Sequence, residues 1–205
     1  RYQPLPSFWR EYTFNSTRFR YNEINNILTK SPKTKDGFLL TETLGCRIKY
    51  EYEKQQPPQR KKVILGKIID NFIKQIFKKY NIKTEGKVFE YKNHKIYLEP
   101  DGYDDKNIYE VKKMTYPQLP ERYLLQATAY MYFFQKQNTY FLVFTDEEFT
   151  IIEFNLQDNY LQELFKTIDN FFTFLPNTNE CKFCEFKNKC KYYKDTTEYI
   201  NGLKV

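Results

Sequence analysis

Hydrophobic residues recur at helical spacing in three long segments of the chain. In "VILGKIIDNFIKQIFKKY" (Val63–Tyr80) an apolar residue returns every four positions, which is typical of one face of an amphipathic helix. A second helical pattern, "ERYLLQATAYMYFFQK" (Glu121–Lys136), starts directly after Pro120. A third, "NYLQELFKTIDNFFTFL" (Asn159–Leu175), runs up to Pro176. The pattern therefore predicts three long helices.

Between these helices, apolar and polar residues alternate with the period of a strand. "KVFEYKN", "HKIYLEP" and "NIYEVKKM" follow one another after Gly86 and predict three strands of a meander. "TYFLVFT" and "FTIIEFN" predict two more strands around a turn at Asp146–Glu148. Helix, meander, helix, hairpin and helix in this order predict an α/β domain with a mixed central sheet flanked by helices.

On this pattern the chain divides into three parts. Residues 1–62 form an irregular region in which prolines interrupt short helical patterns. Residues 63–175 contain all the regular elements without a recognisable linker, and we expect them to form one core. Residues 176–205 show little periodicity and carry three of the four cysteines.

Composition and charge narrow the classes of partner. The 205 residues are 40% apolar, which is enough for one core with appended pieces. The net charge of +7 favours a polyanionic partner such as nucleic acid, although a lysine-rich surface kept for solubility accounts for it equally well. The longest apolar run, Tyr140–Phe144, is far shorter than the ~20 residues of a membrane helix, and no signal-peptide pattern opens the sequence. We therefore expect an intracellular protein with no membrane contact.

The first candidate for chemistry is the acidic stretch "EPDGYDDKNIYEVKK" (Glu99–Lys113). If a hairpin turns at Asp104–Asp105, the side chains of Asp101, Glu110 and Lys112 share one face of the two strands. The two carboxylates are then diagonal neighbours, roughly 5–8 Å apart. Moving the turn by a whole residue keeps this shared face, whereas moving it by half a residue destroys it.

Two converging carboxylates next to a lysine suit phosphodiester hydrolysis. Paired carboxylates repel each other unless a cation lies between them, and such oxygen ligands suit Mg²⁺ or Mn²⁺. A lysine ammonium beside them can orient a water and stabilise charge in the transition state. The alternative is a plain surface hairpin, and for Asp104, Asp105 and Lys106 we expect only a solvated turn.

Three further features occur in a recognisable order. Pro100-Asp101 and Glu110-Val111-Lys112 together read PD…ExK, "QATAY" places Gln126 and Tyr130 at i, i+4 spacing, and "LGKIID" places an acid four residues after a glycine. In this order they resemble the RecB-type branch of the PD-(D/E)xK nuclease superfamily, whose motifs are G-x-x-x-H, D, E-x-K and Q-x-x-x-Y. The resemblance implies a restriction-endonuclease-like core.

The resemblance also implies a role for each matching residue. Asp101, Glu110 and the Val111 carbonyl would hold Mg²⁺ or Mn²⁺ with the help of Asp70. Lys112 would position the attacking water. Gln126 and Tyr130 would face the site and contact the substrate. Without the resemblance, both residues would be assigned to the face of their helix that packs in the core.

Asp70 stands where the family usually has a histidine ligand. An aspartate can also bind Mg²⁺ or Mn²⁺, and the alternative is a polar residue on the outer face of its helix. The single histidine, His94, lies outside the motif, and we expect it to be structural or exposed.

The cysteines form a second candidate site, with one in the N-terminal part and C-x₂-C-x₅-C near the C-terminus: Cys46, Cys181, Cys184 and Cys190. The absence of a secretion pattern and the tight spacing disfavour disulfides. Four thiolates suit either Zn²⁺ or an iron–sulfur cluster, and residue chemistry alone does not separate the two. The spacing and the context "GCRIKYEYE" resemble the clasp of AddB-type and CRISPR-associated RecB-like exonucleases, which implies a cluster, [4Fe–4S] before zinc, with a structural role.

The resemblance therefore implies a metal-dependent DNA nuclease, mainly an exonuclease on single-stranded DNA. It also implies a setting in CRISPR spacer acquisition beside an integrase, or with replication and recombination proteins, and similar stand-alone proteins occur in archaeal viruses. No G-x-x-x-x-G-K-[ST] loop is visible, so the sequence shows no ATPase of its own. Two alternatives stay open: a scaffold or nucleic-acid-binding protein that keeps the fold without catalysis, and a zinc-stabilised binding module.

Overall fold

The computed structural model describes residues 37–55, 72–115, 117–145, 148–177, 181 and 184–193. The elements in chain order are β1 (Phe38–Leu39), α2 (Leu40–Thr43), α3 (Arg47–Gln55), a helix over 72–79, β2 (Lys87–Tyr91), β3 (His94–Leu98), β4 (Gly102–Tyr103), β5 (Asn107–Lys113), α5 (Glu121–Phe134), β6 (Asn138–Phe144), β7 (Phe149–Asn155), α6 (Asp158–Phe172) and a short helix η3 (Lys187–Lys189).

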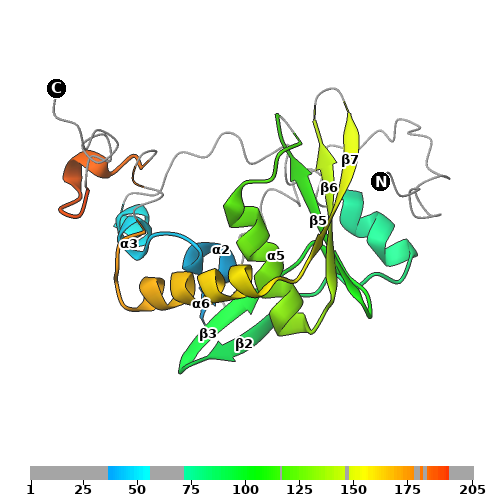
Figure 1. Cartoon of the computed structure of the whole chain (residues 1–205), viewed down its shortest axis with the longest axis horizontal. Coiled ribbons are helices and arrows are strands. Elements are labelled where there is room, and N and C mark those ends of the chain that lie inside the picture. The colour runs from blue at the N-terminus through cyan, green and yellow to red at the C-terminus, as the bar shows by residue number, and fades with distance from the viewer. Residues whose placement is uncertain are drawn as a thin grey trace.

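The strands form two mixed sheets. The larger sheet has the order β4-β5-β6-β7, with β5 and β6 parallel and the other neighbours antiparallel. The smaller sheet has the order β1-β3-β2, with β1 parallel to β3. Helix α5 makes the crossover that the parallel pair β5–β6 requires (Figure 1).

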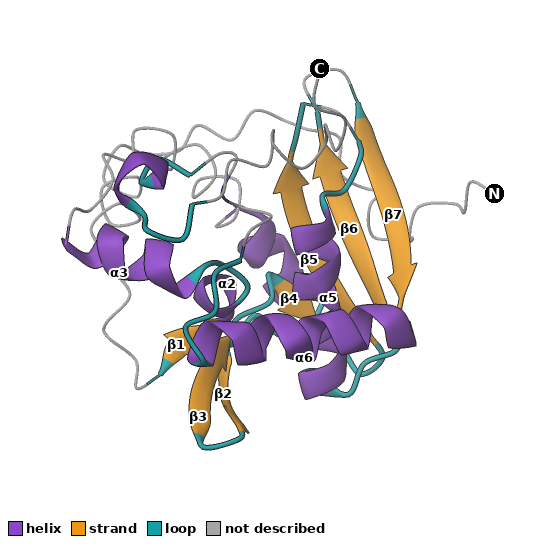
Figure 2. Cartoon of the chain, turned by 60° about the vertical axis from the view of Figure 1, so that its left-hand side comes forward, coloured by secondary structure: helices purple, strands orange, loops and turns teal. Residues whose placement is uncertain are grey.

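Helices cover both faces of the larger sheet (Figure 1). On one face α5 and α6 pack side by side, and their apolar residues join Ile108, Phe141 and Val143 in the main core (Figure 2). On the other face, the helix over 72–79 contributes Ile73 and Phe77 to a second cluster. Strand β5 lies between these two layers, and both of its faces are therefore covered.

Most of the predicted elements are present. Helix α5 follows Pro120 as expected and ends at Gln135, whose left-handed φ of 56° stops the helix. Strands β6 and β7 and helix α6 match their predicted segments to within a few residues at each end. In the predicted helix of 63–80, residues 72–79 are helical, and the rest up to residue 71 lies outside the described residues.

The predicted meander is wrong in one respect, because its strands belong to two different sheets. β2 and β3 form a hairpin in the smaller sheet, whereas β5 pairs with β4 and β6 in the larger one. The chain leaves β3 after Leu98 and re-forms a ladder only at Gly102. Pro100 lies in this gap and has no N–H to donate to a ladder, which accounts for the break.

The N-terminal region, expected to be helical or irregular, contains a short strand and two helices where it is described. β1, α2 and α3 occupy residues 38–55, while residues 1–36 and 56–62 lie outside the described part. The guanidinium of Arg47 lies 4.6 Å from the ring centroid of Phe38 and 5.0 Å from that of Phe171. These contacts tie β1 and α3 to α6.

None of the helices in the described part of the chain has the length and hydropathy needed to cross a lipid bilayer.

Candidate active site

The β4–β5 hairpin brings Asp101 and Glu110 to opposite positions. Gly102 lies opposite Tyr109, and extending this register by one residue places Asp101 opposite Glu110. The turn is thus centred one residue further along the chain than predicted. Because this is a whole-residue shift, the carboxylates still share a face, as direct rather than diagonal neighbours.

Asp104 accounts for the position of the turn. Its Oδ1 accepts the backbone N–H of Lys106 at 2.8 Å and that of Asn107 at 2.7 Å, which closes the turn over these residues. Its other oxygen accepts the hydroxyl of Tyr109 at 2.7 Å. Asp105 and Lys106 are exposed, as expected for a solvated turn, but Asp104 is a structural anchor.

The side chains of β5 alternate between the two layers of the fold. Ile108 is fully buried in the main core beside α5, whereas Tyr109 and Val111 pack on the other face with the helix over 72–79. Glu110 and Lys112 fall on the same side as Ile108. Glu110 is only 2% exposed, which is unusual for a carboxylate.

Short hydrogen bonds connect the hairpin residues. The N–H of Asp101 donates to Glu110 Oε1 at 3.2 Å, and the N–H of Val111 donates to Asp101 Oδ2 at 2.7 Å. Lys112 Nζ donates to Glu110 Oε2 at 2.6 Å. Glu110 and Lys112 are therefore in direct side-chain contact, and Asp101 is joined to Glu110 through its backbone N–H.

Lys112 is nearly buried but remains charged. Burial lowers the pKa of its ammonium, whereas the charges of Glu110 and Asp101 and the hydrogen bond to Glu110 raise it, and the pKa lies above the ordinary lysine value. The ammonium therefore stays protonated at neutral pH. It is a fixed positive charge beside two carboxylates.

Helix α5 supplies the amide and hydroxyl that extend this network. Lys112 Nζ lies 3.4 Å from Gln126 Oε1, and Gln126 Nε2 donates to the hydroxyl of Tyr130 at 2.9 Å. The hydroxyl of Tyr130 in turn donates to the carbonyl of Glu99 at 3.0 Å. Burial, and then the charge of Glu110, raise the pKa of Tyr130 well above its usual value, so this hydroxyl stays neutral.

Two neighbours of the site were not singled out from the sequence. Lys74, on the helix over 72–79, lies 3.4 Å from Glu99 Oε1. The ring of Tyr123 lies against Lys112, with Nζ 4.8 Å from its centroid. Tyr123 precedes Gln126 by three positions, so helical periodicity could have placed it on the same face.

The donor atoms of the hairpin fit a hard divalent cation in part. Asp101 and Glu110 lie opposite each other on the hairpin, and carboxylate oxygens of this kind suit Mg²⁺ or Mn²⁺. In the part of the chain that the structure describes, no group of three or more His, Cys, Asp or Glu side chains has the arrangement of a metal site. Asp70, the expected further ligand, lies outside the described residues.

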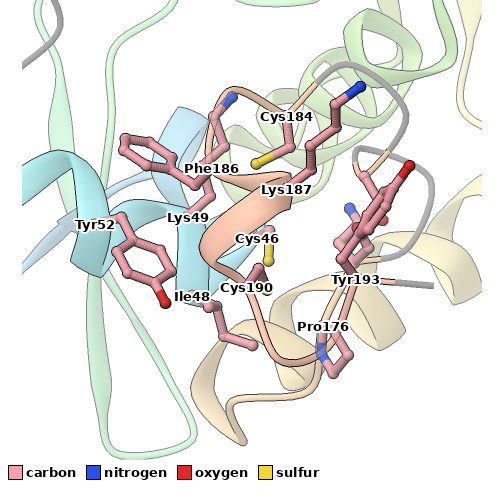
Figure 3. A pocket seen from close by; sticks show the side chains of 12 residues that line it. Cys46, Ile48, Lys49, Tyr52, Pro176, Cys184, Phe186, Lys187, Cys190 and Tyr193 are labelled. Carbon is pink, nitrogen blue, oxygen red and sulfur yellow. The ribbon is translucent and has the colours of Figure 1, made fainter. Parts of the chain in front are cut away.

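All four cysteines line one pocket between α3 and the C-terminal segment (Figure 3), namely Cys46, Cys181, Cys184 and Cys190. None of them is in a disulfide. Their side chains do not form a metal-binding group in the described geometry. The pocket brings the four thiols to one place, and it does not favour an iron–sulfur cluster over zinc.

The walls of this pocket are also held by contacts that need no metal. The hydroxyl of Tyr52, on α3, donates to the carbonyl of Lys189 at 3.0 Å. The Tyr52 ring stacks on that of Phe186, with 5.2 Å between centroids. These contacts join parts of the chain that are far apart in sequence.

His94 lies outside the network of the hairpin. Its ring stacks on Phe172 of α6 with 3.7 Å between centroids. This structural contact agrees with the expectation from its position in the sequence.

Comparisons with known proteins address the fold. No protein-family model matches the chain, and no curated protein matches it. The crystal structure of SSO0001 is similar, with a TM-score of 0.64 and 18% identity over 84% of this chain and 94% of that one. A candidate exonuclease from Eubacterium rectale gives a TM-score of 0.54 and 13% identity over 91% of this chain and 100% of that one. An alkaline exonuclease from Laribacter hongkongensis gives a TM-score of 0.47 and 12% identity over 82% and 90%. The two likenesses above 0.5 show that this chain shares the α/β fold of those two structures.

Proposed function

We propose that the chain is a metal-dependent DNA nuclease that hydrolyses phosphodiester bonds. The observation that carries the proposal is the buried Glu110 carboxylate, which accepts the backbone N–H of Asp101 and the ammonium of Lys112 on the β4–β5 hairpin. Burial of a carboxylate and an ammonium is costly for stability unless both are paired, and such arrangements gather at functional sites. The fold shared with a candidate exonuclease supports the same conclusion.

In this proposal Asp101, Glu110 and the carbonyl of Val111 hold Mg²⁺ or Mn²⁺, with Asp70 as a further ligand. A divalent ion so held lowers the pKa of a bound water and neutralises charge on the phosphate. Lys112 orients the attacking water and stabilises the negative charge that develops on the phosphate. The raised pKa of Lys112 supports this role, because the ammonium stays charged at working pH.

Gln126 and Tyr130 hold the substrate in this proposal. Their side chains reach the network from α5, and Gln126 lies next to the Lys112 ammonium. Single-stranded DNA as the substrate, exonucleolytic cleavage, and a place beside a CRISPR integrase or replication and recombination proteins rest on the motif resemblance. The net charge of +7 is compatible with a DNA partner.

The four-cysteine pocket is proposed to hold an iron–sulfur cluster, [4Fe–4S] first and zinc as the alternative. Anaerobic purification followed by iron, sulfide and zinc analysis separates the two metals. About four iron atoms and four sulfides per chain are expected. A colourless preparation with one zinc per chain would refute the cluster and keep the site.

The nuclease proposal is tested with end-labelled single- and double-stranded DNA, with Mg²⁺, Mn²⁺ or a chelator. Glu110→Gln and Lys112→Met should each reduce the rate by about 10²-fold or more, because each removes a charge from the reacting centre. Lys113→Met is the matched control, since Lys113 is an exposed neighbour on the opposite face of β5, and it should stay within about twofold of wild type.

Release of mononucleotides from one end is expected, in place of internal fragments. Equal activity of wild type and both site variants would mean that the site is misassigned. An inactive wild type that still binds DNA would favour the scaffold, a reading supported only by Asp70 standing in place of histidine.

A further inference from the structure

Tyr123 contacts the Lys112 ammonium through the face of its ring. Nζ lies 4.8 Å from the ring centroid, within the distance at which a cation is attracted to the π electrons. Tyr123 is half-buried on the first turn of α5, and its side chain packs against the main core. Together with Gln126 and Tyr130 it occupies one face of the helix, at spacings of three and seven residues.

The three partners of Lys112, namely Glu110, Gln126 and Tyr123, differ in whether they have a second role in the proposed site. Its shortest is the 2.6 Å bond to Glu110, and the approach to Gln126 is longer, at 3.4 Å. Under the proposed function the Glu110 carboxylate also has to bind a cation, and it then attracts the ammonium less. The Tyr123 ring carries no formal charge and is not a ligand of the cation. Its attraction for the Lys112 ammonium is therefore not weakened when the cation binds.

The hydroxyl of Tyr123 has no hydrogen-bond partner among the residues that the structure describes. Its ring, by contrast, is held between the core and Lys112. The ring is therefore the part of this side chain that acts on the site.

We propose that Tyr123 is a positioning residue of the nuclease site, whose π face keeps the Lys112 ammonium in place while Glu110 is engaged elsewhere. This inference rests on the proposed function. It adds a residue that lies outside the D, E-x-K and Q-x-x-x-Y motifs.

The decisive experiment is a series of fluorinated phenylalanines at position 123. Tyr123→Phe should keep kcat within about twofold, because the ring remains. One, two and three fluorine atoms on that ring weaken its attraction for a cation stepwise with little change of shape. We expect kcat to fall at each step, by about five- to thirtyfold over the series, with the KM for DNA nearly constant.

A control series and a second readout separate positioning from packing. The same residues at Tyr132, an exposed position of α5 that contacts the rings of Phe133 and Phe165, should leave kcat unchanged. In the metal-free protein, the NMR signals of the Lys112 Hε protons should be shifted upfield by the ring in wild type and Tyr123→Phe. In Tyr123→Leu they should move to the position of an exposed lysine.

A kcat that does not depend on fluorine content, in an active enzyme, would overturn the role of Tyr123 and leave the proposed function standing. Lys112 Hε signals that are the same in wild type and Tyr123→Leu would also overturn it. An inactive wild type with shifted Lys112 signals would instead sink the proposed function, and with it any catalytic positioning by Tyr123.

Discussion

The carboxylate of Asp104 connects the turn of the hairpin to the core of the larger sheet. Burial raises its pKa, but the Tyr109 hydroxyl and the N–H groups of Lys106 and Asn107 lower it by more, and the pKa lies below the ordinary aspartate value. Its stabilisation of the fold is therefore complete above the unfolded pKa of about 4, and it is lost as pH falls through the native pKa.

Tyr109→Phe should raise the pKa of Asp104, because one of its hydrogen bonds is removed. The free energy of unfolding should fall by about 1–2 kcal/mol at pH 7, a moderate value because Asp104 is only half-buried. Denaturant unfolding from pH 7 to pH 3 should show the two proteins converging as Asp104 becomes protonated. Tyr140→Phe is the control, since its hydroxyl bonds to Glu153 and not to Asp104. Parallel curves over the whole pH range would contradict this account.

At this scale, alternation along a strand was enough to place Asp101, Glu110 and Lys112 together. The rule depends only on backbone geometry, and it tolerates a turn displaced by a whole residue. It gave the wrong turn position because the side-chain bonds of Asp104 were not considered. Helical periodicity could have placed Tyr123 on the face of Gln126, but its contact with Lys112 also depends on how α5 packs over the sheet.

At the scale of elements, β4 is held against the helix over 72–79 at a position where no side chain fits. A Cβ added to Gly102 would lie 2.5 Å from the ring of Phe77, which is fully buried. The ring has no open space to move into, so the backbone of β4 would have to shift. Because Asp101 is the preceding residue, such a shift would reach the candidate site.

Gly102→Ala should lower the free energy of unfolding by about 1–3 kcal/mol, the usual cost of overpacking a core. The rate of DNA cleavage should fall as well, because Asp101 moves relative to Glu110. Thermal unfolding and the nuclease assay measure the two effects. Asp105→Ala, in the exposed turn of the same hairpin, should change neither. A Gly102→Ala protein as stable as wild type would show that Phe77 relaxes freely.

The elements themselves were predictable where they are long and strongly periodic. The patterns of α5, β6 and α6 each extend over several repeats, and the structure shows these elements close to their expected bounds. The division into two sheets was not predictable, because strand pairing is set by contacts between distant residues. The parallel pairing of β1 with β3 joins residues 38 and 96, and two residues are too few to give a pattern.

At the scale of the whole molecule, the four-cysteine pocket lies between α3 and the segment 184–193 (Figure 3). In the sequence, α3 comes before the core and this segment comes after it. A metal bound by all four thiolates, as proposed, would stabilise the native state, because the unfolded chain does not hold Cys46 close to the other three cysteines. Cys46 and Cys190 belong to the two different parts. Loss of either Cys46 or Cys190 should therefore weaken the connection between α3 and the segment 184–193.

Cys190→Ser should reduce the metal content of the pocket and lower the Tm by about 5 °C or more, because a thiolate ligand is lost. Removing the metal from wild type with a chelator should have a similar effect on Tm. Metal analysis and calorimetry measure both quantities. Asn188→Ser, an exposed change in the same segment, is the control. Unchanged Tm after complete metal loss would mean that the Tyr52 contacts alone hold the segment.

The hydrogen bond from Tyr52 to Lys189 joins residues 137 positions apart, so it can form only after the intervening chain has been synthesised. At about 5–20 residues per second, a ribosome takes roughly 7–30 s to make the intervening polypeptide. The sheets and α5 can assemble in that time, whereas α3 has no partner for Tyr52 until the last cysteines emerge. The metal proposed for the pocket would therefore be bound late in the synthesis of the protein, after the β4–β5 hairpin has been made.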